Sequence, residues 1–212
     1  MSTINEQLLS ACEKNDTQNA LALLNENDID VNVMNTANES AFLLAMRQNN
    51  TEIVNKIVDS GKITLTTVQT AVQDQLNAGK EPKDVLSFSD NYFYKAIANA
   101  TYATWAFFKG ALKDDVLNNL TASGMNAKDA KQLCKQATDT VYPYKKHVRR
   151  MLAGLAWFVG GLIFTLLGYQ FASSSGGGTY AVFWGAMVIG GIQALWGLIG
   201  FLISPKSLKQ VA

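Results

Sequence analysis

The sequence feature that most constrains this chain is a stretch from Met151 to Pro205 that contains no aspartate, glutamate, lysine or arginine. It consists of two long apolar runs, Met151–Ala172 and Tyr180–Ile203. A helix needs about 20 apolar residues to cross the hydrocarbon core of a bilayer, which is roughly 30 Å thick, and both runs exceed this length. Because only the short segment Ser173–Thr179 separates the runs, the sequence predicts a helical hairpin that crosses a membrane twice. A hairpin in the core of a soluble protein is the alternative.

The basic residues beside the two runs predict the orientation of this hairpin. Lys145, Lys146, Arg149 and Arg150 precede the first run, and Lys206 follows the second. Short segments rich in lysine and arginine stay on the cytoplasmic side of a membrane. We therefore expect an integral membrane protein with both termini in the cytoplasm, most simply in a bacterial inner membrane.

The composition of the chain argues against several classes of function. A net charge of +1 gives no basis for nucleic-acid binding, since the one basic cluster lies beside an apolar run. Cys12 and Cys134 lie far apart and predict neither a disulfide framework nor a zinc site. The first residues lack the basic and apolar segments of a cleaved signal peptide. No phosphate-binding or dinucleotide-binding motif is present, and the single histidine, His147, lies within the basic cluster. We therefore expect no cofactor, no metal and no enzymatic activity.

The amino-terminal region contains an internal repeat. Leu8–Cys12 aligns with Phe42–Met46, and at the same offset Asn15 aligns with Asn49. The first copy ends in Ile29-Asp30-Val31-Asn32. This pattern resembles ankyrin repeats, in which two short helices and a tight turn are followed by a loop of this composition. The resemblance implies a stack of helix pairs that binds a cytoplasmic protein partner and has no catalytic site.

The chain also departs from the ankyrin signature at several positions. Ala41 and Leu43 stand where the family has proline and histidine, and Asn49 replaces the glycine of the turn. Asparagine, like glycine, tolerates the left-handed backbone that such a turn needs. A third copy is expected to begin near Thr64, since about three stacked repeats are needed for stability. An unrelated bundle of short helices is the alternative for this region.

A polar break, Lys80–Asp84, predicts the boundary between a repeat domain and a helical adaptor. We expect Ser89 or Asp90 to cap an aromatic helix that extends to about Lys109. Its predicted inward face comprises Phe93, Ile97, Ala100, Thr104 and Phe108. We favour packing of this helix in a protein core over an interfacial position on lipid headgroups. Two shorter helices should follow, the second capped by Asn126; their predicted buried residues are Val116, Leu117 and Leu120, then Ala130, Leu133, Cys134 and Ala137.

Small residues in both apolar runs indicate where the helices touch each other or a second copy of the chain. In lipid, close backbone approach drives the pairing of helices, so patterns of small residues mark contact faces. The predicted helix-packing and oligomer residues are Ala156, Gly160, Gly161, Ala186, Gly190, Gly191 and Gln193. Gln193 is expected to make one hydrogen bond, to Thr165 or to another protomer.

These observations predict an all-α protein with three parts. They are an ankyrin-like helical repeat stack over residues 1–80, a helical adaptor over 81–144, and a two-span transmembrane hairpin with basic flanks over 145–212. The predicted function is a membrane-tethered interaction module that holds a cytoplasmic protein partner at the membrane, with homo-oligomers as a possible form. Two alternatives are an oligomeric pore regulated by its cytoplasmic domain and a secreted effector that inserts in a host membrane.

Overall fold

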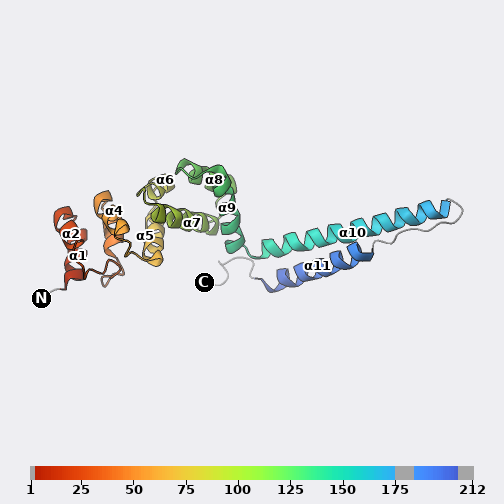
Figure 1. The fold of residues 1–212 in the computed structure, drawn as a ribbon, viewed down its shortest axis with the longest axis horizontal. Coiled ribbons are helices and arrows are strands. Elements are labelled where there is room, and N and C mark those ends of the chain that lie inside the picture. Colours follow the sequence, from red (N-terminus) through yellow and green to blue (C-terminus); the bar gives the residue numbers. More distant parts are fainter. Residues whose placement is uncertain (1–2, 175–183, 205–212) are drawn as a thin grey trace. The chain divides into compact units, whose positions relative to one another are not determined.

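The computed structural model describes residues 3–174 and 184–204, which form eleven α-helices (Figure 1). The all-α fold predicted from the sequence is therefore confirmed for these residues. The chain divides into two compact units, residues 1–137 and residues 138–212. Residues 175–179 of the Ser/Gly segment, the start of the second run and Lys206 lie outside the described residues, whereas Ser173 and Ser174 belong to the end of the first long helix.

The first unit is a stack of short helices arranged in two rows. In one row α1 packs on α3, α3 on α5, and α5 on α7; in the other, α2 packs on α4 and α6 on α8. The eight helices are α1 (Ile4–Glu13), α2 (Thr17–Leu23), α3 (Ala41–Arg47), α4 (Thr51–Asp59), α5 (Leu65–Asn77), α6 (Pro82–Leu86), α7 (Tyr92–Phe108) and α8 (Lys113–Ala122). In the first row each helix thus packs on the next helix of that row.

The first two helix pairs turn in the same way at equivalent positions of the repeat. Asn15 and Asn49 both adopt the left-handed conformation, with φ of 56° and 55°. The next residue in each case, Asp16 or Asn50, donates its backbone N–H to a carbonyl five residues earlier, at 2.8 Å and 2.9 Å. The predicted role of asparagine in these turns is therefore confirmed. Glycine takes the same conformation after α5, α7 and α8, at Gly79, Gly110 and Gly124.

The buried residues of the two pairs also correspond at the offset of the repeat. On α1 they are Leu8, Leu9, Ala11 and Cys12; on α3 the equivalent residues, Phe42, Leu43, Ala45 and Met46, are buried as well. Ala20 and Leu24 correspond in the same way to Val54 and Val58. These side chains fill the space between the rows of helices, and their burial is the main favourable term for a stack of this size.

The loop after α2 ties one pair to the next through the side chain of Asn32. Its Oδ1 accepts hydrogen bonds from the backbone N–H of Thr64 and the hydroxyl of Thr67, at 2.8 Å and 2.9 Å. Its Nδ2 donates to the carbonyl of Lys62 at 2.8 Å. Thr64 is the N-cap of α5, so a helix begins where the third copy was expected, and the identity of this segment as a repeat stays a prediction.

The aromatic helix α7 differs from the prediction at its start and in its buried face. Its cap is Asn91, whose Oδ1 accepts from the backbone N–H of Phe93 at 2.9 Å, so the predicted caps Ser89 and Asp90 were wrong. Phe93 is 43% exposed, whereas Tyr94 is fully buried and donates its hydroxyl to the carbonyl of Val85. Aromatic residues occur around the whole helix, so their spacing alone did not identify the buried side. Core packing, the favoured interpretation, agrees with the contacts of α7 with α5, α6 and α8.

The helices after α7 follow the predicted pattern more closely. Val116 and Leu120 of α8 are buried, while Leu117 is only half-buried. Asn126 accepts the backbone N–H of Asp129 at 2.9 Å and so caps α9 (Ala127–Val141). Ala130, Cys134 and Ala137 of α9 are buried, and Leu133 is half-buried.

The predicted boundary near residue 80 falls inside the first unit. Helix α5 packs against both α6 and α7, so packing is continuous across this position. The limit between the two compact units lies instead at residues 137 and 138. A separate role for residues 81–144 as an adaptor stays a prediction.

The second unit contains the helical hairpin. Helices α10 (Tyr144–Ser174) and α11 (Trp184–Ile203) pack side by side in opposite directions (Figure 1). Helix α10 begins before the apolar run, so the basic residues 145–150 form its first turns.

Candidate functional site: the apolar helix hairpin

The hairpin exposes large apolar side chains along both helices. Helix α10 has 31 residues and α11 has 20, which corresponds to lengths of about 46 Å and 30 Å at 1.5 Å per residue. Trp157, Phe164 and Trp196 are each more than 60% exposed, and most leucine and isoleucine side chains of the two helices are exposed as well. Monomeric soluble proteins rarely leave so large an apolar surface in water. Both helices are long and apolar enough to cross a membrane.

Four buried glycines allow the two helix backbones to approach each other. A Cβ atom at Gly154 would lie 2.4 Å from the backbone nitrogen of Ala194, and one at Gly197 would lie 2.4 Å from that of Met151. At Gly190 the nearest atom would be the backbone nitrogen of Phe158, at 2.6 Å. At Gly161 it would be a side-chain atom, Cγ of Met187, at 3.0 Å. The contact face of the hairpin is therefore built on glycine, as close packing of helices in lipid requires.

The spacing of these glycines differs from the small-xxx-small patterns of the prediction. Gly154 and Gly161 are seven residues apart, and so are Gly190 and Gly197. A seven-residue repeat keeps one stripe of a helix against its partner over successive pairs of turns. Gly154 and Gly197 were not among the predicted contact residues, although this spacing was a signal that could have identified them.

The structure brings some of the predicted packing residues together and leaves others apart. Gly161, Ala186 and Gly190 lie on the contact face, and the Cβ of Ala186 is 3.2 Å from a Cβ placed at Gly161. Gly191 lies at its edge, where a Cβ would meet Phe158 Cδ2 at 3.7 Å. Ala156 is exposed, and no described atom comes within 4 Å of a Cβ at Gly160. Packing of Ala156 and Gly160 against a second copy of the chain stays a prediction.

The predicted hydrogen bond between Gln193 and Thr165 was wrong. The Thr165 hydroxyl donates to the carbonyl of Gly161 in its own helix, at 2.8 Å. Gln193 lies at the level of Gly154, because its backbone carbon would be 2.9 Å from a Cβ placed there. Thr165 is eleven residues further along α10, which is about 16 Å at 1.5 Å per residue. The bond to another protomer, the other expectation for Gln193, stays a prediction.

At one end of the hairpin the basic residues of α10 lie beside the last turns of α11. Lys145, Lys146, Arg149 and Arg150 are exposed, and Arg149 forms an ion pair with Asp139. His147 differs from these exposed cations because its ring is half-buried. A Cβ atom placed at Gly200 would lie 2.0 Å from the Nδ1 atom of His147, so the ring packs directly against this glycine. The basic cluster therefore marks this end of the hairpin, while its histidine is a packing residue.

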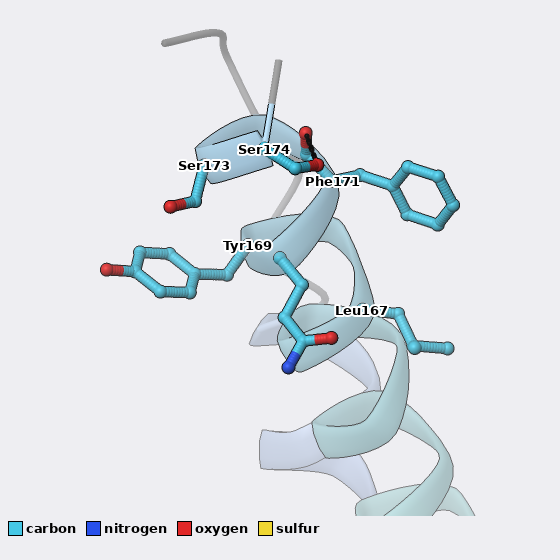
Figure 2. A pocket seen from close by; sticks show the side chains of 6 residues that line it. Leu167, Tyr169, Phe171, Ser173 and Ser174 are labelled. Carbon is cyan, nitrogen blue, oxygen red and sulfur yellow. Dashed lines mark hydrogen bonds between the residues drawn. The ribbon is translucent and has the colours of Figure 1, made fainter. Parts of the chain in front are cut away.

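The opposite end of α10 carries a hollow of about 410 Å³. Figure 2 shows Leu167 and Phe171 on one side of the helix end and Tyr169 on the other. The hydroxyl of Ser174 donates to the carbonyl of Phe171 at 3.0 Å, within the same turn. All described residues that line the hollow belong to this one helix end, and their polar groups do not converge on a common point.

The first unit contains a more enclosed cavity of about 460 Å³ between the turn after α3 and helices α5 and α6. Its lining residues are Met46, Asn49, Thr51, Gln75, Lys80, Glu81, Asp84, Val85, Ser87 and Phe88. The ammonium group of Lys80 donates to the carbonyl of Met46 at 3.2 Å and to Oδ1 of Asn49 at 2.7 Å. This cavity differs from the hollow on α10 because several helices contribute charged and amide groups to it.

Beside this cavity, Arg47 holds two carboxylates of the first unit. Its guanidinium donates to both oxygens of Asp74, at 2.8 Å and 3.0 Å, and it also pairs with Glu39. The hydrogen bonds from Arg47 hold the pKa of the Asp74 carboxyl below its usual range. For Glu39 the pKa is lowered first by a hydrogen bond from Asn35 and then by Arg47.

The cysteines lie in packed surroundings. Cys12 and Cys134 are both buried, and burial raises the pKa of the Cys12 thiol to about 12. A thiol of this kind is protonated at neutral pH and reacts slowly. Within residues 3–174 and 184–204, no group of three or more histidine, cysteine, aspartate or glutamate side chains is placed to hold a metal ion.

Comparison of the chain with protein-family models, curated proteins and solved structures finds no match. The functional interpretation therefore depends only on the helical stack and the hairpin.

Proposed function

We propose that this chain is a membrane-tethered protein-interaction module. In this proposal the hairpin α10–α11 crosses a bilayer twice, and the helical stack of the first unit remains in the cytoplasm and holds a protein partner at the membrane. The observation that carries the proposal is the combination of a charge-free sequence from Met151 to Pro205 with outward-facing apolar side chains on two helices packed through glycine. In lipid, apolar side chains outside and small residues inside are the favoured arrangement.

Three features of the first unit support an interaction role of the ankyrin type. The helices pack in two rows, the first two turns share left-handed asparagines at equivalent positions, and the loop residue Asn32 links consecutive pairs. Stacks of this kind present an extended surface to proteins. The identity of the stack as ankyrin repeats is part of the proposal.

The orientation of the hairpin follows from its charged end. The exposed cations at the start of α10 belong on the cytoplasmic side by the positive-inside rule, which also places Lys206 there. The far end, with Ser174, then reaches the opposite side of the membrane. A bacterial inner membrane is the simplest location for such a protein.

Site-directed labelling in intact cells tests insertion and orientation together. With an impermeant thiol reagent added outside, Ser174→Cys should be labelled and Lys206→Cys should be labelled only after the membrane is permeabilised. The parent chain is the matched control, because its two cysteines are buried and should stay unlabelled. Labelling of Lys206→Cys alone in intact cells would reverse the orientation, and release of the protein by alkaline carbonate would reject the membrane tether. Reproducible single-channel currents that depend on Gln193 in planar bilayers would favour a pore instead.

A further inference from the structure

One pair of cations at the start of α10 has partners within the hairpin unit. Lys145 and Arg149 are four residues apart, so they lie on the same face of the helix. The ammonium group of Lys145 lies 4.3 Å from the ring centre of Tyr142, a cation–π contact, and Arg149 forms its ion pair with Asp139. Asp139 is the only aspartate or glutamate in the sequence of residues 138–212, which contains six lysines and arginines. The hairpin unit therefore has no second acidic side chain with which another of its cations could pair.

The other pair of cations, Lys146 and Arg150, lies on the flank of the hairpin that borders α11. The two residues are four apart, and Trp157 follows Arg150 by seven, so all three share one face of α10. This face adjoins α11, because a Cβ atom placed at Gly190 would lie 3.0 Å from Cβ of Trp157. Lys146 and Arg150 are exposed, and neither forms an ion pair with another described residue. Two unpaired cations thus lie at the edge of an exposed apolar surface.

The same flank contains the polar side chain of Gln193. Gly191 borders Phe158 on the opposite flank, and Gln193 is two residues further on, which turns it by about 200° to the flank of Trp157. Its backbone carbon would be 2.9 Å from a Cβ placed at Gly154, so it lies at that level of α10. The side chain of Gln193 is half-buried and makes no hydrogen bond with another described residue. In a bilayer such an amide needs a partner from protein or lipid, since the hydrocarbon core provides no water.

The depth between the cations and this amide matches the headgroup layer of a phospholipid. Arg150 precedes Gly154 by four residues, which is about 6 Å along α10 at 1.5 Å per residue. A bilayer about 40–45 Å thick with a hydrocarbon core of about 30 Å leaves about 5–7 Å for each headgroup layer. In this layer the phosphate lies on the water side and the ester carbonyls lie next to the hydrocarbon. A phosphate beside Lys146 and Arg150 therefore places an ester carbonyl at the level of Gln193.

We infer that this flank of the hairpin binds an anionic phospholipid. Lys146 and Arg150 hold the phosphate, the Gln193 amide donates to an ester carbonyl, and an acyl chain lies along Trp157. An acidic headgroup is favoured over a zwitterionic one, because each cation near the membrane surface attracts anionic lipid. This inference rests on the proposed membrane insertion of the hairpin and requires no property of the helical stack.

Lipid titration of the full-length protein in mild detergent, followed by native mass spectrometry, tests the headgroup preference. Dioleoyl phosphatidylglycerol is the anionic probe, and dioleoyl phosphatidylcholine is the matched zwitterionic lipid with the same chains. We expect the first phosphatidylglycerol to bind about thirtyfold more tightly, from about fivefold for each of two cations. The preference should be lost in the double variant Lys146→Gln/Arg150→Gln. It should be retained in Lys145→Gln/Arg149→Gln, which removes the same charge from the other face. Equal binding of the two lipids by the parent, or equal effects of the two double variants, would overturn the inference.

A second titration tests the contact with Gln193 on the parent protein. Diether phosphatidylglycerol has the same headgroup but no ester carbonyls, so it should bind about fivefold more weakly than the ester lipid, the effect of one hydrogen bond. Gln193→Leu should bind the ester lipid as weakly as the parent binds the ether lipid. Gln170→Leu, the same change near the other end of α10, should leave binding unaltered. Equal affinity of the parent for the ester and ether lipids would reject Gln193 as a lipid contact. Displacement of phosphatidylglycerol by millimolar inorganic phosphate would reject the lipid in favour of a free-phosphate site.

The starting material distinguishes failure of this inference from failure of the proposed function. The protein for both titrations is taken from the membrane fraction that resists alkaline carbonate. Release of the protein by carbonate would reject the membrane tether and the lipid site together. Protein that resists carbonate but shows no preference for phosphatidylglycerol would leave the tether standing and reject the lipid site.

Discussion

Adding one methyl group at Gly154 should separate the two helices of the hairpin. A Cβ there would lie 2.4 Å from the nitrogen of Ala194, 2.6 Å from the oxygen of Gly190 and 2.9 Å from the carbon of Gln193. All three are backbone atoms, so no side-chain rotation relieves the overlap, and α11 must move by about 1 Å to restore ordinary contact distances of about 3.5 Å. A shift of about 1 Å loses a quarter to a half of the dispersion energy between the atoms that it separates. We expect Gly154→Ala to destabilise the hairpin by about 1–3 kcal/mol, the usual cost of overpacking.

Gly160→Ala is the matched control, because it makes the same chemical change on the same helix. No described atom lies within 4 Å of a Cβ at Gly160, so this variant should be neutral or more stable, by up to about 1 kcal/mol from helix propensity. Both variants can be compared by unfolding the protein in mixed micelles with increasing dodecyl sulfate and following the separation of α10 and α11 by fluorescence energy transfer. Equal midpoints for Gly154→Ala and Gly160→Ala would refute the proposed backbone contact.

Two further predictions concern the first unit. Ala45 is completely buried, so Ala45→Asp should destabilise the stack by about 3–5 kcal/mol through an unpaired buried carboxylate. Thermal melts should show this loss, while Asn55→Asp at an exposed position of α4 should melt like the parent. Arg47→Met should cost about 1 kcal/mol at neutral pH, since its ion pairs are partly exposed, and Lys56→Met serves as the control. Because the pKa of Asp74 is lowered in the folded state, its contribution exists above the unfolded pKa of about 3.9 and is lost as the pH falls through the folded value. Acid titration of stability should therefore be shallower below about pH 4 in Arg47→Met than in the parent, and identical acid limbs would contradict the role of the pair.

The sequence identified those parts of the fold that depend on local chemistry. The left-handed asparagines and the cap of α9 at Asn126 both follow from what a side chain can do to its own backbone. The apolar runs likewise predicted two long helices, because their composition leaves few other structures. These features were visible without knowing which helices pack together.

Features that depend on the neighbouring helix were harder to predict. Of the predicted inward residues of α7 only Ile97 is buried, because aromatic residues surround the helix. Only the positions of α5, α6 and α8 determine that Tyr94 is inside. The register of the hairpin decided that Gly154 meets Ala194 and that Thr165 is far from Gln193, and no pattern in one helix contains this register. Gln75 is only 1% exposed, and this burial depends on the neighbouring helices, since a glutamine in an amphipathic helix is usually exposed.

Glycine serves two separate physical purposes in this chain, and the structure distinguishes them. At Gly79, Gly110 and Gly124 the backbone has φ between 83° and 94°, and no described atom lies within 4 Å of an added Cβ, so glycine is present for its conformation. Asn15 and Asn49 occupy equivalent turns, which indicates that these positions accept a residue tolerant of left-handed backbone. At Gly154, Gly190 and Gly197 the φ angle is ordinary, but backbone atoms of the facing helix leave no room for a Cβ atom. Glycine is therefore present at these positions because it has no side chain. The stack can therefore vary at its turns while the hairpin cannot vary at its contact face.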